Sequence, residues 1–146
     1  MANSYTRASA AIENVTPEEG AWWDFFLVPT DELSEQEKKE RMERFGLDEY
    51  DVETFPEFNS GYIPREEIIW ITHDESINVD HVAMVVQEFL RRFRPDDAWG
   101  MEYAMTCTKP RIGEFGGGAF VVTATDEEWM STGTWLSKEL KKHDPR

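Results

Sequence analysis

Cys107 is the single cysteine of the chain and the residue type best suited to nucleophilic chemistry. Lys109 and Arg111 follow it closely, and nearby cations lower the pKa of a thiol and favour the reactive thiolate. A lone cysteine is also a common small apolar side chain of a protein core. The sequence therefore leaves two roles open for Cys107, a catalytic thiol and a core side chain.

Two histidines lie on either side of a turn rich in carboxylates: His73 follows an expected central strand, and His81 opens the next helix. Imidazole and carboxylate groups can ligate metals or share a proton. The spacing matches no ligand signature, and such polar residues also cap turns and helices. We predict no metal site and no cofactor, and one cysteine excludes an intrachain disulfide and a multi-cysteine zinc site.

A run of three glycines and a local excess of bases suggest an anion site. Glycine loses more conformational entropy on folding than other residues, so the run needs a reason: a bulge, a close backbone approach, or N–H groups that bind an anion. Residues 88–111 hold four acids and five bases, in a chain of net charge −15. The alternative roles of the bases are helix-dipole pairing and ordinary salt bridges. The candidate anion-binding residues are Arg91, Arg92, Arg94, Lys109, Arg111, Gly116, Gly117 and Gly118.

An acidic insert over residues 31–60 mixes carboxylates with aromatic side chains. Residues 31–58 hold eleven acids and four bases, a net charge of −7. Charge runs are usually solvated, but rings among carboxylates would give contact area for a basic protein. The predicted partner-binding surface consists of Glu49, Tyr50, Asp51, Glu53, Phe55, Glu57 and Phe58.

Capping signals and apolar periodicity predict the helices that would position these residues. Thr16-Pro17-Glu18-Glu19 is a capping box with a favoured proline and predicts a helix over 17–27. Ser34 and Glu37 form a second box, before a helix over 34–45. The clearest amphipathic helix has apolar residues at positions 82, 85, 86, 89, 90 and 93. The capping pattern of Thr125 to Glu128 and the apolar residues 135, 136 and 140 predict a last helix to about residue 142.

Strands are expected over 5–14, 68–72, 99–107 and 118–125, and irregular structure over 47–64. The order is therefore β-α-(insert)-β-α-β-β-α. It predicts a single α+β domain over residues 1–146. The expected architecture is a two-layer sandwich with about four strands and helices on at least one face.

Composition excludes several classes of function. The chain has 146 residues with 15 Lys+Arg and 30 Asp+Glu, so it lacks the basic footprint of a general nucleic-acid binder. The acidity also argues against anionic membranes, and no apolar run approaches the length of a spanning helix. The first eleven residues lack the apolar region of a secretory signal, so the expected compartment is the cytoplasm.

Several segments resemble a group of small, uncharacterised proteins encoded by phages, prophages and plasmids. They are residues 79–82, 89–96 and above all 107–119, with the opening 16–19 and the closing 128–129 and 135–136. The resemblance covers most of residues 5–137 and is weakest over the acidic insert. The group has no assigned activity, so it implies no functional residues. It implies an accessory gene of a mobile element, and such genes often encode small acidic inhibitors of host defence or replication proteins.

Three functions remain open on these grounds. The leading hypothesis is a non-enzymatic module that binds a basic protein, as an inhibitor of a host defence or nucleic-acid-handling protein. The alternative is a small-molecule or nucleotide-binding domain or enzyme, with Cys107 or His73 near the anion site. The third is a homo-oligomer joined through aromatic residues, for which Trp22, Trp23 and Trp129 are candidates.

Overall fold

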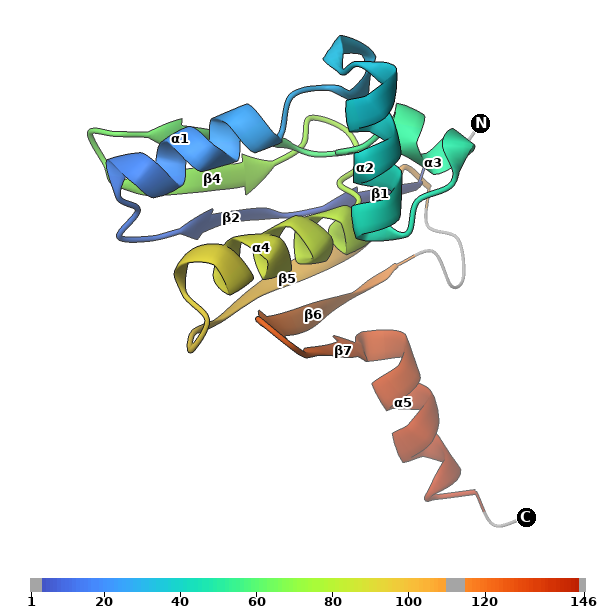
Figure 1. The fold of residues 1–146 in the computed structure, drawn as a ribbon. Coiled ribbons are helices and arrows are strands. Elements are labelled where there is room, and N and C mark those ends of the chain that lie inside the picture. Colours follow the sequence, from blue (N-terminus) through green and yellow to red (C-terminus); the bar gives the residue numbers. More distant parts are fainter. Residues whose placement is uncertain (1–3, 110–114, 145–146) are drawn as a thin grey trace.

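The computed structural model describes residues 4–109 and 115–144 (Figure 1). In chain order the elements are β1 (Ser4–Arg7), β2 (Ser9–Ile12), α1 (Pro17–Phe26), the 3₁₀ helix η1 (Thr30–Glu32), α2 (Glu35–Phe45), α3 (Glu49–Glu53), β3 (Asn59–Ile63), β4 (Ile68–Thr72), α4 (Val79–Phe93), β5 (Ala98–Cys107), β6 (Gly116–Thr123), β7 (Glu127–Ser131) and α5 (Thr132–Lys141). The predicted α+β class is confirmed.

The strands form two antiparallel sheets, of order β1-β5-β6-β7 and β2-β4-β3. Only Ala8 separates β1 from β2, so one extended segment pairs with β5 through its first half and with β4 through its second. The indole Nε1 of Trp99 in β5 also donates to the carbonyl of Ala11 in β2, at 3.0 Å. The fold thus has more strands than the four expected, because β1 and β2 divide the first strand and β3 and β7 were not predicted.

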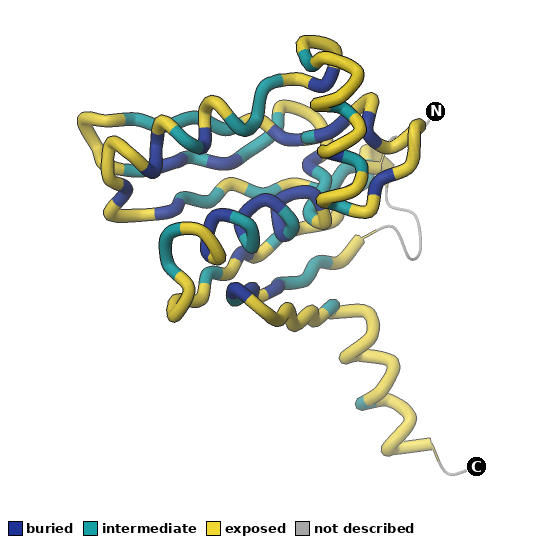
Figure 2. The backbone as a smooth tube through the Cα atoms, in the orientation of Figure 1, coloured by how far each residue is buried: buried dark blue, intermediate teal, exposed yellow. Residues whose placement is uncertain are grey.

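The core lies between the sheets and helices α1 and α4. Helix α4 buries six apolar side chains with at most 2% exposure, and the helix contacts both β5 and β6. These side chains are Val82, Ala83, Val85, Val86, Phe89 and Leu90. Ile69 and Ile71 of β4 meet them from one sheet and Phe120 of β6 from the other. Figure 2 shows the buried positions facing the interior between these elements.

Both predicted capping boxes are present. Thr16 Oγ1 accepts the backbone N–H of Glu19, and the Glu19 carboxylate accepts the N–H of Thr16. Ser34 and Glu37 form the same pair of hydrogen bonds at the start of α2, and Gly46 ends that helix in the left-handed conformation. These ends formed as predicted because a capping box is satisfied within four consecutive residues.

The prediction that Thr125 to Glu128 caps a helix is wrong. The N–H of Thr123 donates to the carbonyl of Asp126 at 2.8 Å, which turns the chain from β6 into β7. Trp129 then lies across the strands from Phe120, with ring centroids 4.7 Å apart. The last helix begins only at Thr132, with Ser131 as its cap.

Residues 47–64 are more regular than expected. Asp48 caps the short helix α3 by accepting the N–H groups of Tyr50 and Asp51, and residues 59–63 form β3. Phe55 and Phe58 are only 2% and 6% exposed, so they belong to the core and their rings cannot contribute to a surface. The prediction that Phe55 and Phe58 belong to the partner-binding surface is therefore wrong. Burial of their rings stabilises the packing of the insert against the domain.

Phe55 and Tyr50 give a direct test of this arrangement. Phe55→Ala removes a buried ring between Phe45 and His81, and we expect a loss of about 3–5 kcal/mol in the free energy of unfolding. Tyr50 is 85% exposed, so Tyr50→Ala should change that free energy by only about 0.5 kcal/mol or less. Urea denaturation followed by circular dichroism measures both, and similar losses in the two variants would contradict the placement of the insert.

Candidate functional site

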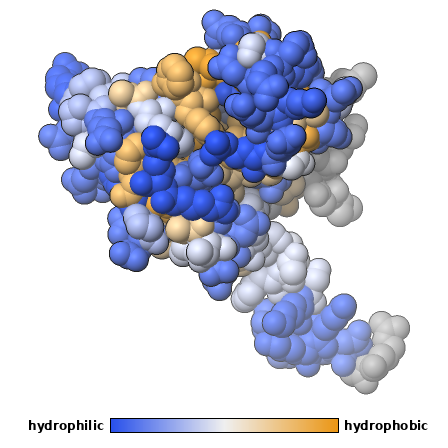
Figure 3. Space-filling model, viewed as in Figure 1, coloured by the Kyte–Doolittle hydropathy of each residue, from blue (hydrophilic) through white to orange (hydrophobic). Residues whose placement is uncertain are grey.

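Residues 30–57, which comprise η1, α2 and α3, form an acidic lobe at one end of the molecule (Figure 1). All eleven acids of this lobe have exposed side chains. They are Asp31, Glu32, Glu35, Glu37, Glu40, Glu43, Asp48, Glu49, Asp51, Glu53 and Glu57. Hydrophilic residues cover the region of α2 and α3 in Figure 3, and an apolar area lies beside them. Five of the seven residues predicted to bind a partner lie on this exposed surface, and Phe55 and Phe58 lie beneath it.

Three of the four bases in the lobe are engaged within the protein. Lys38 forms a salt bridge with Glu53 inside the lobe. Arg44 reaches Glu88 on α4 at 2.7 Å, and Arg41 is 7% exposed. Lys39 is exposed. The surface that the lobe presents is therefore more negative than its net charge of −7 suggests.

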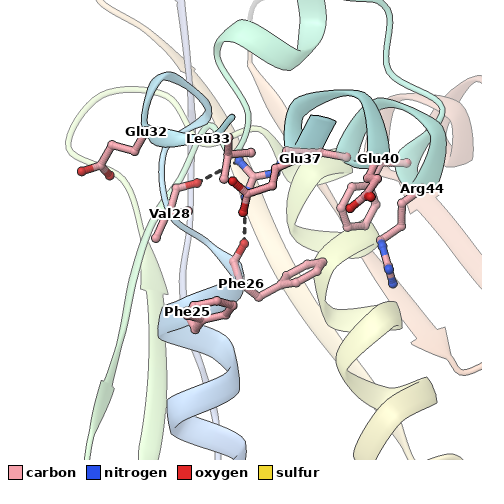
Figure 4. Close-up of a pocket in the computed structure, with 10 residues that line it drawn as sticks. Phe25, Phe26, Val28, Glu32, Leu33, Glu37, Glu40 and Arg44 are labelled. Carbon is pink, nitrogen blue, oxygen red and sulfur yellow. Dashed lines mark hydrogen bonds between the residues drawn. The ribbon is translucent and has the colours of Figure 1, made fainter. Parts of the chain in front are cut away.

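Arg41 anchors the lobe to the end of α1. Its guanidinium donates to the carbonyl of Phe26 at 2.7 Å and to the carbonyl of Val28 at 2.8 Å, the two hydrogen bonds dashed in Figure 4. It also donates to the hydroxyl of Thr30 at 3.1 Å. It also lies over the ring of Phe55, 5.5 Å from the centroid. Burial lowers the pKa of Arg41, and the nearby Glu37 carboxylate opposes that effect. Arg41 thus satisfies the carbonyls that the end of α1 leaves unpaired.

A cleft of about 390 Å³ lies between the end of α1, η1 and α2. Its lining is a mixture of aromatic rings and carboxylates: Phe25, Phe26, Val28, Glu32, Leu33, Glu37, Glu40, Arg41, Arg44 and Phe45. Phe25 is 81% exposed. Figure 4 shows Glu32 on η1 and Glu37 and Glu40 on α2, with Phe25 and Phe26 on α1 opposite them. Two hydrogen bonds from Ser34 lower the pKa of Glu37 and so favour its charged form.

Sequence reasoning missed this cleft. Phe25 belongs to the apolar stripe of α1 with Trp22 and Phe26, but its side chain is exposed whereas that of Trp23 is buried. Glu37 is predicted from the sequence as a capping residue and not as part of a cleft. One signal in the sequence could have indicated an exposed ring. Four of the ten residues of α1 are aromatic, and such a stripe is wider than the side of the helix that faces the core.

The arginines proposed for an anion site do not meet Lys109 in the described part of the chain. Arg94 forms a salt bridge with Glu19 at 2.9 Å, and Arg91 donates to the carbonyl of Ala124. Arg92 lies against the ring of Phe93, 5.7 Å from the centroid. Lys109 lies beyond the opposite end of β5, and ten extended residues span about 33 Å. Arg111 lies outside the described residues.

The glycines pack closely against neighbouring strands. A Cβ on Gly117 would lie 2.6 Å from the carbonyl oxygen of Tyr103, and one on Gly118 would lie 2.4 Å from that of Met130. The N–H of Gly117 donates to Thr132 Oγ1 at 3.0 Å. Gly116 is exposed at the start of β6. Close approach of backbones therefore accounts for Gly117 and Gly118.

The remaining candidates for chemistry have local roles. Cys107 is half-buried at the end of β5, opposite Ser4 of β1. The Nδ1 of His73 accepts the N–H of Glu75 in the turn after β4. Within residues 4–109 and 115–144, no three His, Cys, Asp or Glu side chains are grouped to hold a metal ion. None of the helices in that same part of the chain is long and apolar enough to cross a membrane.

Comparisons with models of protein families, with curated proteins and with solved structures found no match.

His81 joins α4 to the acidic lobe. It is 5% exposed, its Nδ1 accepts the backbone N–H of Glu57 at 3.1 Å, and its ring lies 4.7 Å from that of Phe55. Burial lowers the pKa of His81 below its ordinary value of 6.5, against the opposing effect of Glu57, Asp80 and Asp51. The neutral form is the one that can accept this hydrogen bond.

This arrangement predicts a pH-dependent stability. Below pH 6.5 the unfolded chain takes up a proton at His81 before the folded chain does. The contribution of neutral His81 is therefore fully present above that pH and is lost as the pH falls through the lower folded pKa. Urea denaturation at a series of pH values should show this decline in wild type and in His73→Gln, and a smaller one in His81→Gln. Equal declines in all three proteins would contradict the assignment.

Proposed function

We propose that this protein acts by binding a basic protein through the acidic lobe and the cleft beside it. The observation that carries the proposal is the cleft between α1 and α2, which carboxylates and aromatic rings line together. A lysine or arginine side chain of a partner fits this chemistry, because carboxylates attract the cation and a ring binds its face or its aliphatic stem.

The charge distribution supports the same proposal. Eleven carboxylates are exposed on the lobe. The side chains of Arg41, Lys38 and Arg44 instead form hydrogen bonds or salt bridges with groups of this chain. Such a surface attracts a basic partner from a distance and speeds association at low ionic strength. Exposed rings at Phe25 and Tyr50 supply the apolar contact area that an interface needs at its centre.

The resemblance to proteins of mobile elements gives this binding a context. We infer an accessory protein that acts in the cytoplasm on a host defence or nucleic-acid-handling protein, because proteins that handle nucleic acids carry basic surfaces. Inhibition would follow from covering such a surface. The proposal requires no cofactor, metal or catalytic residue.

The lobe can be tested by removing charge without removing volume. The lobe variant carries Glu32→Gln, Glu40→Gln, Glu49→Gln and Asp51→Asn, all at exposed positions. The matched control carries Glu13→Gln, Glu66→Gln, Glu75→Gln and Asp96→Asn, which remove the same charge from exposed positions elsewhere. Four exposed ion pairs contribute about 0.2–1 kcal/mol each, so we expect the lobe variant to bind roughly tenfold more weakly.

The measurement is an affinity capture from host lysate at low and high salt, followed by titration of the purified captured protein. One dominant basic partner, retained by wild type and control and weakened in the lobe variant, is the expected result. Equal weakening in both variants would show that only net charge matters. Unchanged binding by the lobe variant would place the binding surface elsewhere.

A further inference from the structure

A second cleft, of about 340 Å³, lies where α5 follows the edge strand β7 (Figure 1). Its lining combines aromatic rings, hydroxyls and one lysine: Tyr103, Trp129, Met130, Ser131, Thr134, Trp135 and Lys138. Tyr103 pairs with Gly118, and Trp129 pairs with Phe120 two residues further along β6, so both rings project from the same face of the sheet. Trp135 lines the same cleft from the first turn of α5. A cleft of this size can hold a small molecule.

Two hydrogen bonds and one glycine hold the walls of this cleft in place. Thr132 Oγ1 accepts the N–H of Gly117 at 3.0 Å and donates to the carbonyl of the same residue at 3.1 Å, which ties the start of α5 to β6. A Cβ on Gly118 would lie 2.5 Å from the hydroxyl oxygen of Tyr103, so the glycine makes room for this ring. The aromatic walls are therefore positioned before a ligand binds.

The charge of this cleft differs from that of the cleft beside the acidic lobe. Lys138 is the only charged residue among the described residues that line it, whereas three carboxylates line the other cleft. Within residues 4–109 and 115–144, Lys138 has no carboxylate partner, and Lys142, one turn further along α5, pairs with Glu139 at 2.9 Å. A free ammonium group attracts an anion and disfavours a cation.

The aromatic rings of the cleft favour a flat ligand. Trp129 and Trp135 are 38% and 58% exposed, so both indoles are partly accessible to a ligand. Indole rings stack on planar π systems, and this stacking depends little on the identity of the ring. The hydroxyls of Tyr103, Ser131 and Thr134 add hydrogen-bond donors and acceptors.

We propose that this cleft binds a small molecule in which a planar aromatic ring carries an anionic group. The ring stacks against Trp129 and Trp135, and the anionic group lies at the ammonium of Lys138. Nucleoside monophosphates and aromatic carboxylates both have this chemistry. A nucleic-acid chain does not fit, because its many phosphates would be repelled by a protein of net charge −15. The cleft shares no residue with the acidic lobe, so this site is independent of the function proposed above.

The test is a titration of the purified full chain, followed through the indole N–H signals of Trp129 and Trp135 in two-dimensional NMR spectra. The probes are adenosine monophosphate and indole-3-acetate. Adenosine and indole-3-acetamide carry the same rings without the charge, and inorganic phosphate is an anion without a ring. Both indole signals should shift with at least one probe at millimolar concentration. The uncharged form of that probe should bind about threefold more weakly, and phosphate should leave the signals unchanged.

Two pairs of variants locate the ligand. Trp135→Ala should weaken binding about tenfold, because stacking on one ring is lost. Lys138→Gln should weaken it about threefold, because an exposed ion pair is lost. Leu140→Ala and Lys141→Gln, on the same helix but outside the cleft, should bind as wild type does. All four side chains are exposed, so the fold, followed by circular dichroism, should persist.

Each outcome of the titration decides for or against the proposal. Binding of one probe alone would support it and identify the ligand as a nucleotide or as an aromatic carboxylate, and binding of both would support the shared chemistry. Indole signals that stay unchanged with both probes would overturn it, and so would equal affinity for the charged and uncharged rings. Equal weakening by Trp135→Ala and Leu140→Ala would also overturn it, because the ligand would then lie outside the cleft.

Discussion

The burial of one face of α4 is the interaction on which the other parts of the structure depend. Val82, Val85, Val86, Phe89 and Leu90 of this face are at most 2% exposed, and they contact strands of both sheets. The two sheets share the extended segment of β1 and β2, and the hydrogen bond from Trp99 to Ala11 also joins them. A single amphipathic helix therefore packs against both sheets and covers the core between them. Without this helix the two sheets could move apart. It also provides the residues that hold the acidic lobe, because His81 is in its first turn and Glu88 accepts Arg44.

The acidic lobe shows how a highly charged segment is kept in place. Its carboxylates repel one another, so its attachment relies on a few buried groups: the rings of Phe55 and Phe58, the guanidinium of Arg41 and the imidazole of His81. Arg41 and His81 bond to backbone groups, which fixes the path of the chain without neutralising the carboxylates. The negative surface is thus preserved for an external cation. In the proposed function this arrangement supplies both long-range attraction and a defined cleft for contact.

The two ends of the molecule differ in chemistry. At one end, acidic side chains surround the cleft between α1 and α2. At the other, α5 and β7 expose apolar side chains beside lysines.

The sequence by itself determined the elements whose signals are local. The capping boxes of α1 and α2 and the periodicity of α4 each lie within one helix, and they predicted the helix starts closely. It could not separate Phe55 and Phe58 from Tyr50, because all three rings stand among carboxylates and only packing against Phe45 and His81 buries two of them. Nor could it place Arg91, Arg92 and Arg94 apart from Lys109, since the length of β5 separates them in space. In the sequence the apolar stripe of α5 cannot be distinguished from a stripe that faces the core, and only the tertiary structure shows that it is exposed. The physical reason is common to these cases: burial and convergence depend on contacts between residues distant in sequence, which no local pattern encodes.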